Sequence, residues 1–457
     1  MRIVIVGGGF VGTAVACHLL RNAESGTELT MLNSGGAIAR GLAYGTRSPN
    51  HLLNVPVARM SWTAEQPNDF FNWLQNQGQT FHGHDFVRRS YYGDYLNDTL
   101  NAHLQHRSDL LWQSKHETVL RIQKAVGEKF ALWTSEGRWL TADRVILALG
   151  NFAPKSPHHS LDALPKQNYV ADPWQPDAYD SLSTDAGVCI IGTGLTMLDV
   201  LVSLRDGGHR GPVLALSRRG LVPLAHRSNE LPPPGWLPSG PWPMPAELRH
   251  LFRQVRRAAA QAVADGFDWR DVWVAIRAKT PQLWQALPER ERAQFLRHAQ
   301  ILWDTHRHRA APASIRSMKH AAESGKLTIA AGRILHSETE GKRVRLRWRD
   351  RKNQQVHDLI VDRILNCSGP SSRIADDRSK LFSALDRQQM LLPCSLGLGV
   401  KVDAAYRLLD SSGTPQEGLY YAGPLLKSQH WEATAVPELR LHAEAVARHC
   451  LSERNPI

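Results

Sequence analysis

Short apolar runs that end in glycine-rich turns are the strongest pattern in this chain. Residues 2–6 read Arg-Ile-Val-Ile-Val, a glycine-rich turn follows over residues 7–12, and residues 13–20 form a largely apolar segment of helical character. The same order returns at residues 187–191, Gly-Val-Cys-Ile-Ile, followed by a turn and a second apolar helical segment. A strand, a tight turn and a helix in this order predict a parallel α/β unit. Two copies predict two such domains.

The rest of the chain extends these two units and separates them. Apolar runs predict strands at residues 28–33 and within the meander 118–149, and again near the C-terminus at residues 418–423. Residues 221–245 are rich in proline and cannot form regular elements. Apolar positions at helical spacing over residues 248–303 then predict three inserted helices whose tryptophans form a core.

The glycine spacing of the two turns indicates what they bind. Gly7, Gly9 and Gly12 have the spacing that holds a dinucleotide pyrophosphate, and Gly192 and Gly194 repeat it in part. The first glycine allows the tight turn, the second lets the backbone approach the phosphates, and the third lets the helix pack against the strand. The helix N-terminus offers free N–H groups to the anion. One such motif is a weak signal, but two indicate two dinucleotides.

The predicted fold class is therefore α/β, with two Rossmann-like dinucleotide-binding domains, the second inserted in the first, plus a helical insertion. We expect a discontinuous first dinucleotide-binding domain, which the resemblance described below implies is the FAD-binding one, at residues 1–180 and 360–457. The second, NAD(P)-binding domain is expected at residues 186–222 and 313–359, and a Pro-rich loop with the helical insertion at residues 223–312.

Residues at the strand ends indicate the identity of each dinucleotide. The second strand of the first domain ends at Asn33, where an acidic residue usually bonds the ribose hydroxyls, and an amide can bond them too. The matching strand of the second domain ends in Ser217, Arg218 and Arg219, which suit a 2′-phosphate because guanidinium forks match phosphate geometry. This favours NADP over NAD, and the alternative is a basic turn on the surface.

Three further glycines end apolar strands and are expected to bring the backbone close to a cofactor. They are Gly150, Gly369 and Gly423. The alternative for such a position is an edge strand with a turn glycine.

Composition limits the possible partners. The net charge is +12, and two bound dinucleotides with an anionic substrate account for it better than nucleic acid does. The sequence contains no apolar run of about 20 residues that could span a membrane. Its five cysteines include no C-x-x-C pair, which fits a reduced cytoplasm and suggests neither a dithiol centre nor a metal site.

The chain resembles the flavoproteins with two dinucleotide-binding domains, which are glutathione-reductase-like in fold. Within that group it is most similar to a bacterial family of FAD/NAD(P)-binding proteins. The segments that carry the resemblance extend over nearly the whole chain, at residues 40–46, 51–56, 92–96, 192–197, 303–309 and 435–440. The resemblance implies FAD on the first domain and NADPH on the second. Some similar proteins are amino-acid N-oxygenases, and more distant relatives are N-hydroxylating and Baeyer–Villiger-type monooxygenases. Gly423-Pro424 departs from the Gly-Asp of many two-domain flavoproteins, whose Asp bonds the FAD ribityl chain.

Five residues are candidates for the reaction site. Asn54 is expected near the flavin ring, or else as a turn amide that bonds its own backbone. The helix that begins near Val436 is expected to direct its N-terminus at the flavin pyrimidine. Glu432, just before it, suits a proton relay or a surface ion pair. Arg307 and Arg309 suit a clamp on a substrate carboxylate, or else a solvated helix end.

These observations predict an FAD-dependent, NADPH-using monooxygenase that oxidises a small polar, acidic substrate, with amine N-oxidation as one form of the reaction. Because the sequence has no C-x-x-C pair, oxygen or a small organic molecule must accept the electrons. One alternative is an NADPH-dependent flavin reductase or dehydrogenase without oxygen insertion. Another is a non-catalytic dinucleotide-binding redox sensor. The expected partners are a small-molecule substrate and oxygen.

Overall fold

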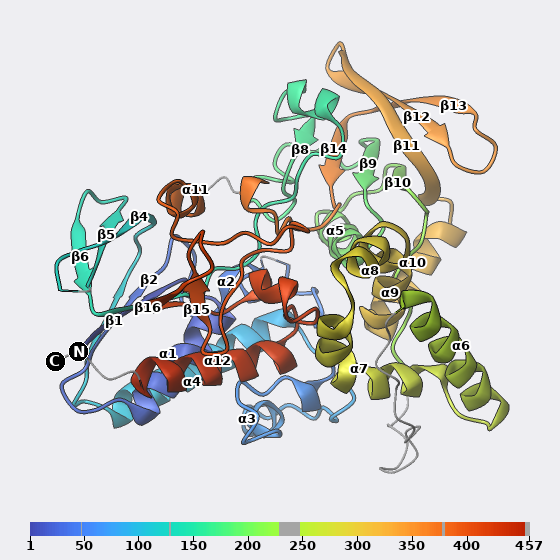
Figure 1. Cartoon of the computed structure of the whole chain (residues 1–457). Helices are drawn as coiled ribbons and strands as arrows, with labels where there is room; N and C mark the ends of the chain where they lie inside the picture. The colour runs from blue at the N-terminus through green and yellow to red at the C-terminus, as the bar shows by residue number, and fades with distance from the viewer. Residues whose placement is uncertain (47, 128, 228–246, 377–379, 453–457) are drawn as a thin grey trace.

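Two parallel sheets, each covered by helices, form the framework of the chain (Figure 1). The computed structural model describes residues 1–46, 48–127, 129–227, 247–376 and 380–452. Most of the predicted proline-rich loop therefore lies outside the described residues.

The first sheet has the strand order β15-β16-β7-β1-β2-β3. Its strands are β1 (Arg2–Val6), β2 (Glu28–Leu32), β3 (Leu111–Lys115), β7 (Arg144–Leu147), β15 (Arg407–Leu409) and β16 (Pro415–Tyr421). Neighbouring strands are parallel except for β15 and β16. Its helices are α1 (Phe10–Asn22), α4 (Arg89–His106) and α12 (Val436–Ser452), which lie together below the sheet in Figure 1.

Strand β1 has an almost continuous apolar sequence because both of its faces are covered. Ile3 and Ile5 pack into the cluster formed with α1, α4 and α12. Val4 and Val6 point to the opposite face, toward the small antiparallel sheet of β4 (Val119–Lys124), β5 (Phe130–Thr134) and β6 (Trp139–Ala142) and toward α11 (Lys380–Arg387).

The second sheet has the strand order β13-β12-β11-β10-β9-β14-β8. Its strands are β8 (Tyr169–Val170), β9 (Val188–Ile191), β10 (Val213–Ser217), β11 (Leu327–Glu340), β12 (Arg343–Asp350), β13 (Val356–Val361) and β14 (Arg363–Asn366). The pairs from β8 to β11 are parallel, and β11 to β13 form an antiparallel extension at the top right of Figure 1. Helices α5 (Leu195–Asp206) and α10 (Pro312–Glu323) accompany this sheet.

The domain boundaries differ from the predicted ones at two strands. Strands β8 and β14 were expected in the first domain, but both belong to the second sheet, where β14 pairs with β9 and β8. Apolar runs of this length suit either sheet, so their composition does not reveal which one they join.

The inserted helices form a separate aromatic core. They are α6 (Leu248–Ala264), α7 (Trp269–Ala286), α8 (Glu289–Gln294), the π-turn η3 (Phe295–Ala299) and α9 (Gln300–Arg307). Trp273, Trp284 and Trp303 are buried here and pack with Trp431 from the segment before α12. The expectation that the tryptophans form a core is confirmed for these rings.

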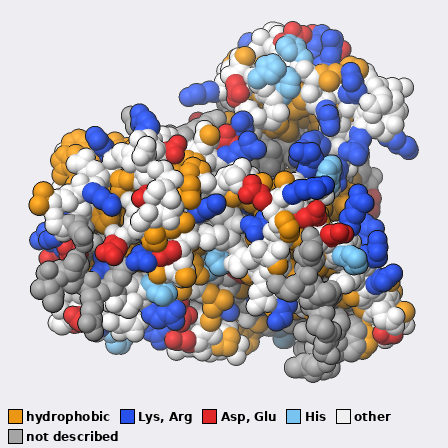
Figure 2. Space-filling view, viewed as in Figure 1, with side chains coloured by type: hydrophobic (Ala, Val, Ile, Leu, Met, Phe, Trp, Pro, Cys, Tyr) orange, Lys and Arg blue, Asp and Glu red, His pale blue; other side chains and the backbone are white. Residues whose placement is uncertain are grey.

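Short helices complete the described structure. They are α2 (Gly41–Tyr44), α3 (Asp69–Asn76), and the 3₁₀ turns η1 (Val57–Arg59), η2 (His159–Ala163), η4 (Ile374–Asp376) and η5 (Pro424–Ser428). Within the described residues, no helix combines the length and the apolar character needed to cross a membrane. Figure 2 shows Lys and Arg side chains spread over the visible face among acidic and neutral ones.

Buried polar contacts join the two domains. Arg89, at the start of α4, forms an ion pair of 2.8 Å with Asp199 on α5, and both side chains are 13% exposed. His51 Nε2 lies 3.0 Å from the Ser203 hydroxyl on the same helix. Burial raises the pKa of the Asp199 carboxyl, and the Arg89 guanidinium opposes that rise. These contacts fix α5, which begins at the second glycine turn, against the first domain.

Candidate cofactor and substrate site

The two glycine-rich turns share one backbone conformation. Gly7 and Gly192 have φ values of +115° and +109°, which L-residues with side chains rarely adopt. A Cβ would lie 2.4 Å from the Ala148 carbonyl oxygen at the first position and 2.2 Å from the Cys367 carbonyl oxygen at the second. Each turn therefore needs glycine because a neighbouring strand passes directly against it.

The second glycine of each turn faces open space. Gly9 and Gly194 cap α1 and α5 with nearly equal φ and ψ, −83° and −165° against −86° and −162°. A Cβ on Gly9 would meet only the Gly41 Cα, at 3.7 Å, and a Cβ on Gly194 would meet nothing within 4 Å. Neither helix has a side-chain cap, so its first N–H groups are free for an anion. These cradles fit a dinucleotide pyrophosphate.

The other predicted glycines also form two groups, those that close packing requires and those that face open space. A Cβ on Gly12 would lie 1.9 Å from the Gly7 carbonyl oxygen, so packing alone requires that glycine. Gly423 has φ of +147°, and its Cβ would lie 2.8 Å from the Leu149 carbonyl oxygen. Gly150 and Gly369 have no atom within 4 Å of a Cβ. The last two leave free space at the strand ends where the sequence pattern predicts a cofactor.

Asn33 lies at the end of β2, beside the first glycine turn, and is buried. Its Nδ2 donates to the Gly35 carbonyl at 2.9 Å, and its Oδ1 accepts from the Gly8 N–H at 3.4 Å. The amide thus holds the loop after β2 against the turn, and its oxygen keeps a lone pair for a further donor.

The group of basic side chains at the end of β10 includes one more arginine than the sequence indicates. Ser217 lies 2.8 Å from the Thr193 hydroxyl inside the second glycine turn. Arg219 donates to a backbone carbonyl of η3, whereas the exposed Arg218 has a single contact with the described residues, in which its backbone carbonyl accepts from Arg351 at 3.3 Å. Arg351 therefore joins the predicted phosphate-binding group. No local signal could have found it, because it lies in the distant turn between β12 and β13.

A cavity of about 250 Å³, which we call the cationic cavity, brings four of the predicted residues together. Asn54, Arg307, Arg309 and Val436 all line it. Its walls come from the first domain, from α7 and α9, and from the start of α12. The fifth, Glu432, lies directly behind this wall, in contact with Arg307.

Glu432 and Arg307 form a buried ion pair, and the surface pair that the sequence left open is therefore excluded. Arg307 Nη2 lies 2.8 Å from Glu432 Oε2, with the side chains 11% and 2% exposed. Trp303 Nε1 donates to the other carboxylate oxygen at 3.2 Å. Burial lowers the pKa of Arg307, and the charge of Glu432 opposes that shift. Most of the charge of Arg307 is thus neutralised within the protein.

A second carboxylate neutralises a second guanidinium of the cavity. Arg277 on α7 binds Glu438 in the first turn of α12 through two contacts, of 2.5 Å and 2.7 Å. This fork links the helical insertion to the helix whose N-terminus borders the cavity.

Arg59 and Arg309 carry the unneutralised charge of the cationic cavity. Neither has a carboxylate partner among the described residues. Burial and the neighbouring guanidiniums lower the pKa of each to about 10, so both remain cationic at neutral pH. Sequence reasoning missed Arg59, the last residue of η1, because it lies just beyond the segment 51–56 that carries the family resemblance.

The N-terminal third of the chain matches a known family. Residues 4–152 match a family model described as FAD-NAD(P)-binding. The matched residues make up the N-terminal part of the first domain, through β7. No curated protein matches the sequence.

Solved structures match over almost the full length. The ornithine hydroxylase from Pseudomonas aeruginosa has a TM-score of 0.65 at 16% identity, with 98% of each chain covered. The fold is that of the two-domain flavoproteins. The ornithine N-hydroxylase of Kutzneria sp. 744, solved with reduced FAD, NADP⁺ and ornithine, has a TM-score of 0.62 at 13% identity, covering 98% of this chain and 97% of its own. An FAD-bound cadaverine monooxygenase from Erwinia amylovora has a TM-score of 0.65 at 10% identity, covering 99% and 95%.

The flavoprotein fold predicted from the sequence is thereby confirmed. The roles of single residues in cofactor and substrate binding stay predictions. Their placement indicates which side chains already have a partner within the protein and which could bind a ligand.

Proposed function

We propose that this chain is an FAD- and NADPH-dependent monooxygenase that oxidises a small acidic substrate at an amine. The observation that carries the substrate class is the pair of unneutralised guanidiniums, Arg59 and Arg309, in the cationic cavity. The flavoprotein fold supports the cofactors, and the amine hydroxylases among the structural matches support the type of reaction.

Each part of the site would have a separate task. The turns at Gly9 and Gly194 would hold the two pyrophosphates, and the FAD and NADPH bound there would supply the electrons of the reaction. Arg59 and Arg309 would bind a substrate carboxylate through charge-assisted hydrogen bonds. Trp273 would form part of a wall that keeps water from the reacting atoms.

Rapid mixing tests the reaction type. FAD-loaded protein is reduced anaerobically with NADPH and then mixed with oxygen while the flavin spectrum is recorded. A transient that differs from both oxidised and reduced flavin is expected. Direct return to the oxidised spectrum with release of peroxide, with and without substrate, would instead support a reductase. Failure of NADPH to bleach the flavin would support a redox sensor.

Arg309→Ala tests the anion site. Loss of one charge-assisted contact costs about 1.5–3 kcal/mol, so the dissociation constant for succinate should rise roughly 10- to 100-fold. Isothermal titration of the FAD-loaded protein measures it. Arg218→Ala is the control, because it lies outside the cavity and should weaken NADPH binding only. Unchanged succinate affinity in the Arg309 variant would remove the basis for an acidic substrate.

A further inference from the structure

His226 lies among the cations of the cationic cavity, and the function proposed above gives it no task. Its backbone N–H donates to the Ala310 carbonyl at 3.0 Å, and Ala225 forms a parallel β-bridge with Ala310. This bridge sets His226 beside Arg309, the residue before Ala310. The imidazole and one of the two unneutralised guanidiniums therefore border the same space.

A contact with the first domain fixes the tautomer of His226. Its Nε2 lies 3.0 Å from the backbone carbonyl oxygen of Asn54. A carbonyl can only accept, so Nε2 carries the hydrogen and the neutral ring keeps its lone pair on Nδ1. Among the described residues, no donor contacts Nδ1. The ring of Phe86 packs against the imidazole at 5.0 Å between centroids.

The surroundings keep His226 neutral. Burial lowers its pKa to about 3, and the charges of Arg309, Arg307 and Arg59 add to the shift, while the contact with Asn54 opposes it. The ring is thus a hydrogen-bond acceptor at any pH near neutrality. It is thus a neutral acceptor beside the guanidiniums, which can only donate.

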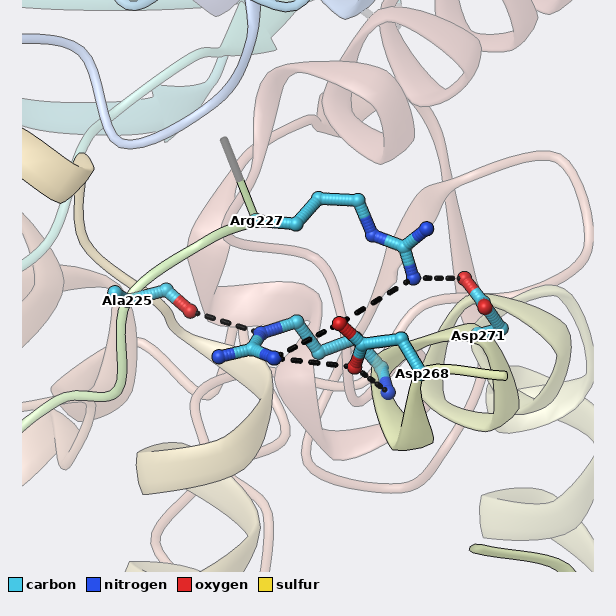
Figure 3. A network of polar contacts seen from close by, with 5 residues as sticks. Ala225, Arg227, Asp268 and Asp271 are labelled. Atoms are coloured by element: carbon cyan, nitrogen blue, oxygen red, sulfur yellow. Dashed lines mark hydrogen bonds and ion pairs between the residues drawn. The ribbon is translucent and has the colours of Figure 1, made fainter. Parts of the chain in front are cut away.

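The chain on both sides of His226 is held to α7 (Figure 3). Arg270 donates through Nε to the Ala225 carbonyl at 3.0 Å, and Arg227 pairs with the buried carboxylate of Asp271. Because its neighbours are fixed, the imidazole is oriented before any ligand binds, which reduces the entropy cost of recognition.

We propose that His226 Nδ1 accepts a hydrogen bond from the substrate amine, so that the cavity selects acids that carry an amine in addition to their carboxylate. This assignment rests on the acidic substrate proposed above and names the group that recognises its nitrogen. Arg59 and Arg309 donate to the carboxylate, and His226 accepts from the amine. A carboxylic acid of the same size without an amine leaves the acceptor unpaired, which lowers its affinity.

Matched acids with and without an amine test this assignment. The dissociation constants of aspartate and succinate, and of glutamate and glutarate, are measured by titration of the FAD-loaded protein. We expect the better amino acid to bind at least about 10-fold more tightly than its matched acid, the equivalent of one good hydrogen bond. His226→Leu should abolish this ratio and leave the affinity for the plain acid within about twofold.

His226→Gln provides the matched control. Its amide can donate to the Asn54 carbonyl and present an acceptor oxygen, so it should restore part of the preference. A ratio that persists in the Leu variant, or a wild type that shows no preference in either pair, would overturn the assignment. Failure of all four acids to bind would overturn the anion site as well. An amine preference without any transient on oxygen mixing would reject the monooxygenase and keep the role of His226.

Discussion

Arg307→Ala is expected to lower the free energy of unfolding by about 3–5 kcal/mol, because it leaves a buried carboxylate without its partner. Glu432 is 2% exposed, so its charge depends on partners within the protein, of which Arg307 is the cation at 2.8 Å. Urea unfolding of the FAD-loaded protein, followed by tryptophan fluorescence, measures the loss. The aromatic core that includes Trp303 surrounds this ion pair, so the signal reports on it directly.

The double variant Arg307→Ala/Glu432→Gln separates the ion pair from side-chain volume. It removes the unpaired charge and keeps an oxygen for Trp303 Nε1. It should therefore recover a large part of the lost stability. If the single variant Arg307→Ala were as stable as wild type but bound substrate more weakly, the result would favour the substrate-carboxylate clamp that the sequence suggests for Arg307.

Gly9→Ala should fold like wild type yet lose FAD affinity by at least about 100-fold, or about 2.7 kcal/mol. Its conformation suits alanine, and the added methyl meets nothing closer than 3.7 Å in the protein. It would occupy the space that we propose for the FAD pyrophosphate. Retention of FAD on gel filtration, followed by titration of the apoprotein, measures the change, and thermal melting of the apoprotein confirms the fold.

Gly194→Ala is the matched variant in the second domain, because its backbone angles are almost the same. It should keep FAD and lose reduction by NADPH. If both variants bind both dinucleotides normally, the two cradles are not the pyrophosphate sites.

The parts of the site that the sequence predicts are the ones determined by local geometry. The helix contact at Gly12 depends on Gly7 within the same motif, so the motif alone indicates it, whereas the carbonyl of Ala148 that packs against Gly7 comes from a distant strand end. The strand at β14 was assigned to the wrong domain, since its apolar sequence suits either sheet.

The rest of the site depends on ion pairs and contacts between residues that are distant in the sequence. A cluster of basic residues at the end of α9 suggests a clamp, but Glu432 pairs with Arg307, and Arg309 has no carboxylate partner among the described residues. Arg59 and His226 carry no sequence signal, because each gains its role from residues distant in the chain. Charge balance inside a cavity depends on which side chains find partners, and the pattern of one strand or helix does not contain that information.

The first domain is assembled from segments on both sides of the second domain. Strands β1 to β3 and β7 precede it, whereas β15, β16 and α12 follow it. During synthesis, the second domain and the helical insertion therefore leave the ribosome before the first sheet is complete. The turn at Gly9 is made before the second domain, but residues 434–436, which form part of one wall of the cationic cavity, are made after it. A growing chain thus carries its nucleotide cradles well before it can enclose a substrate.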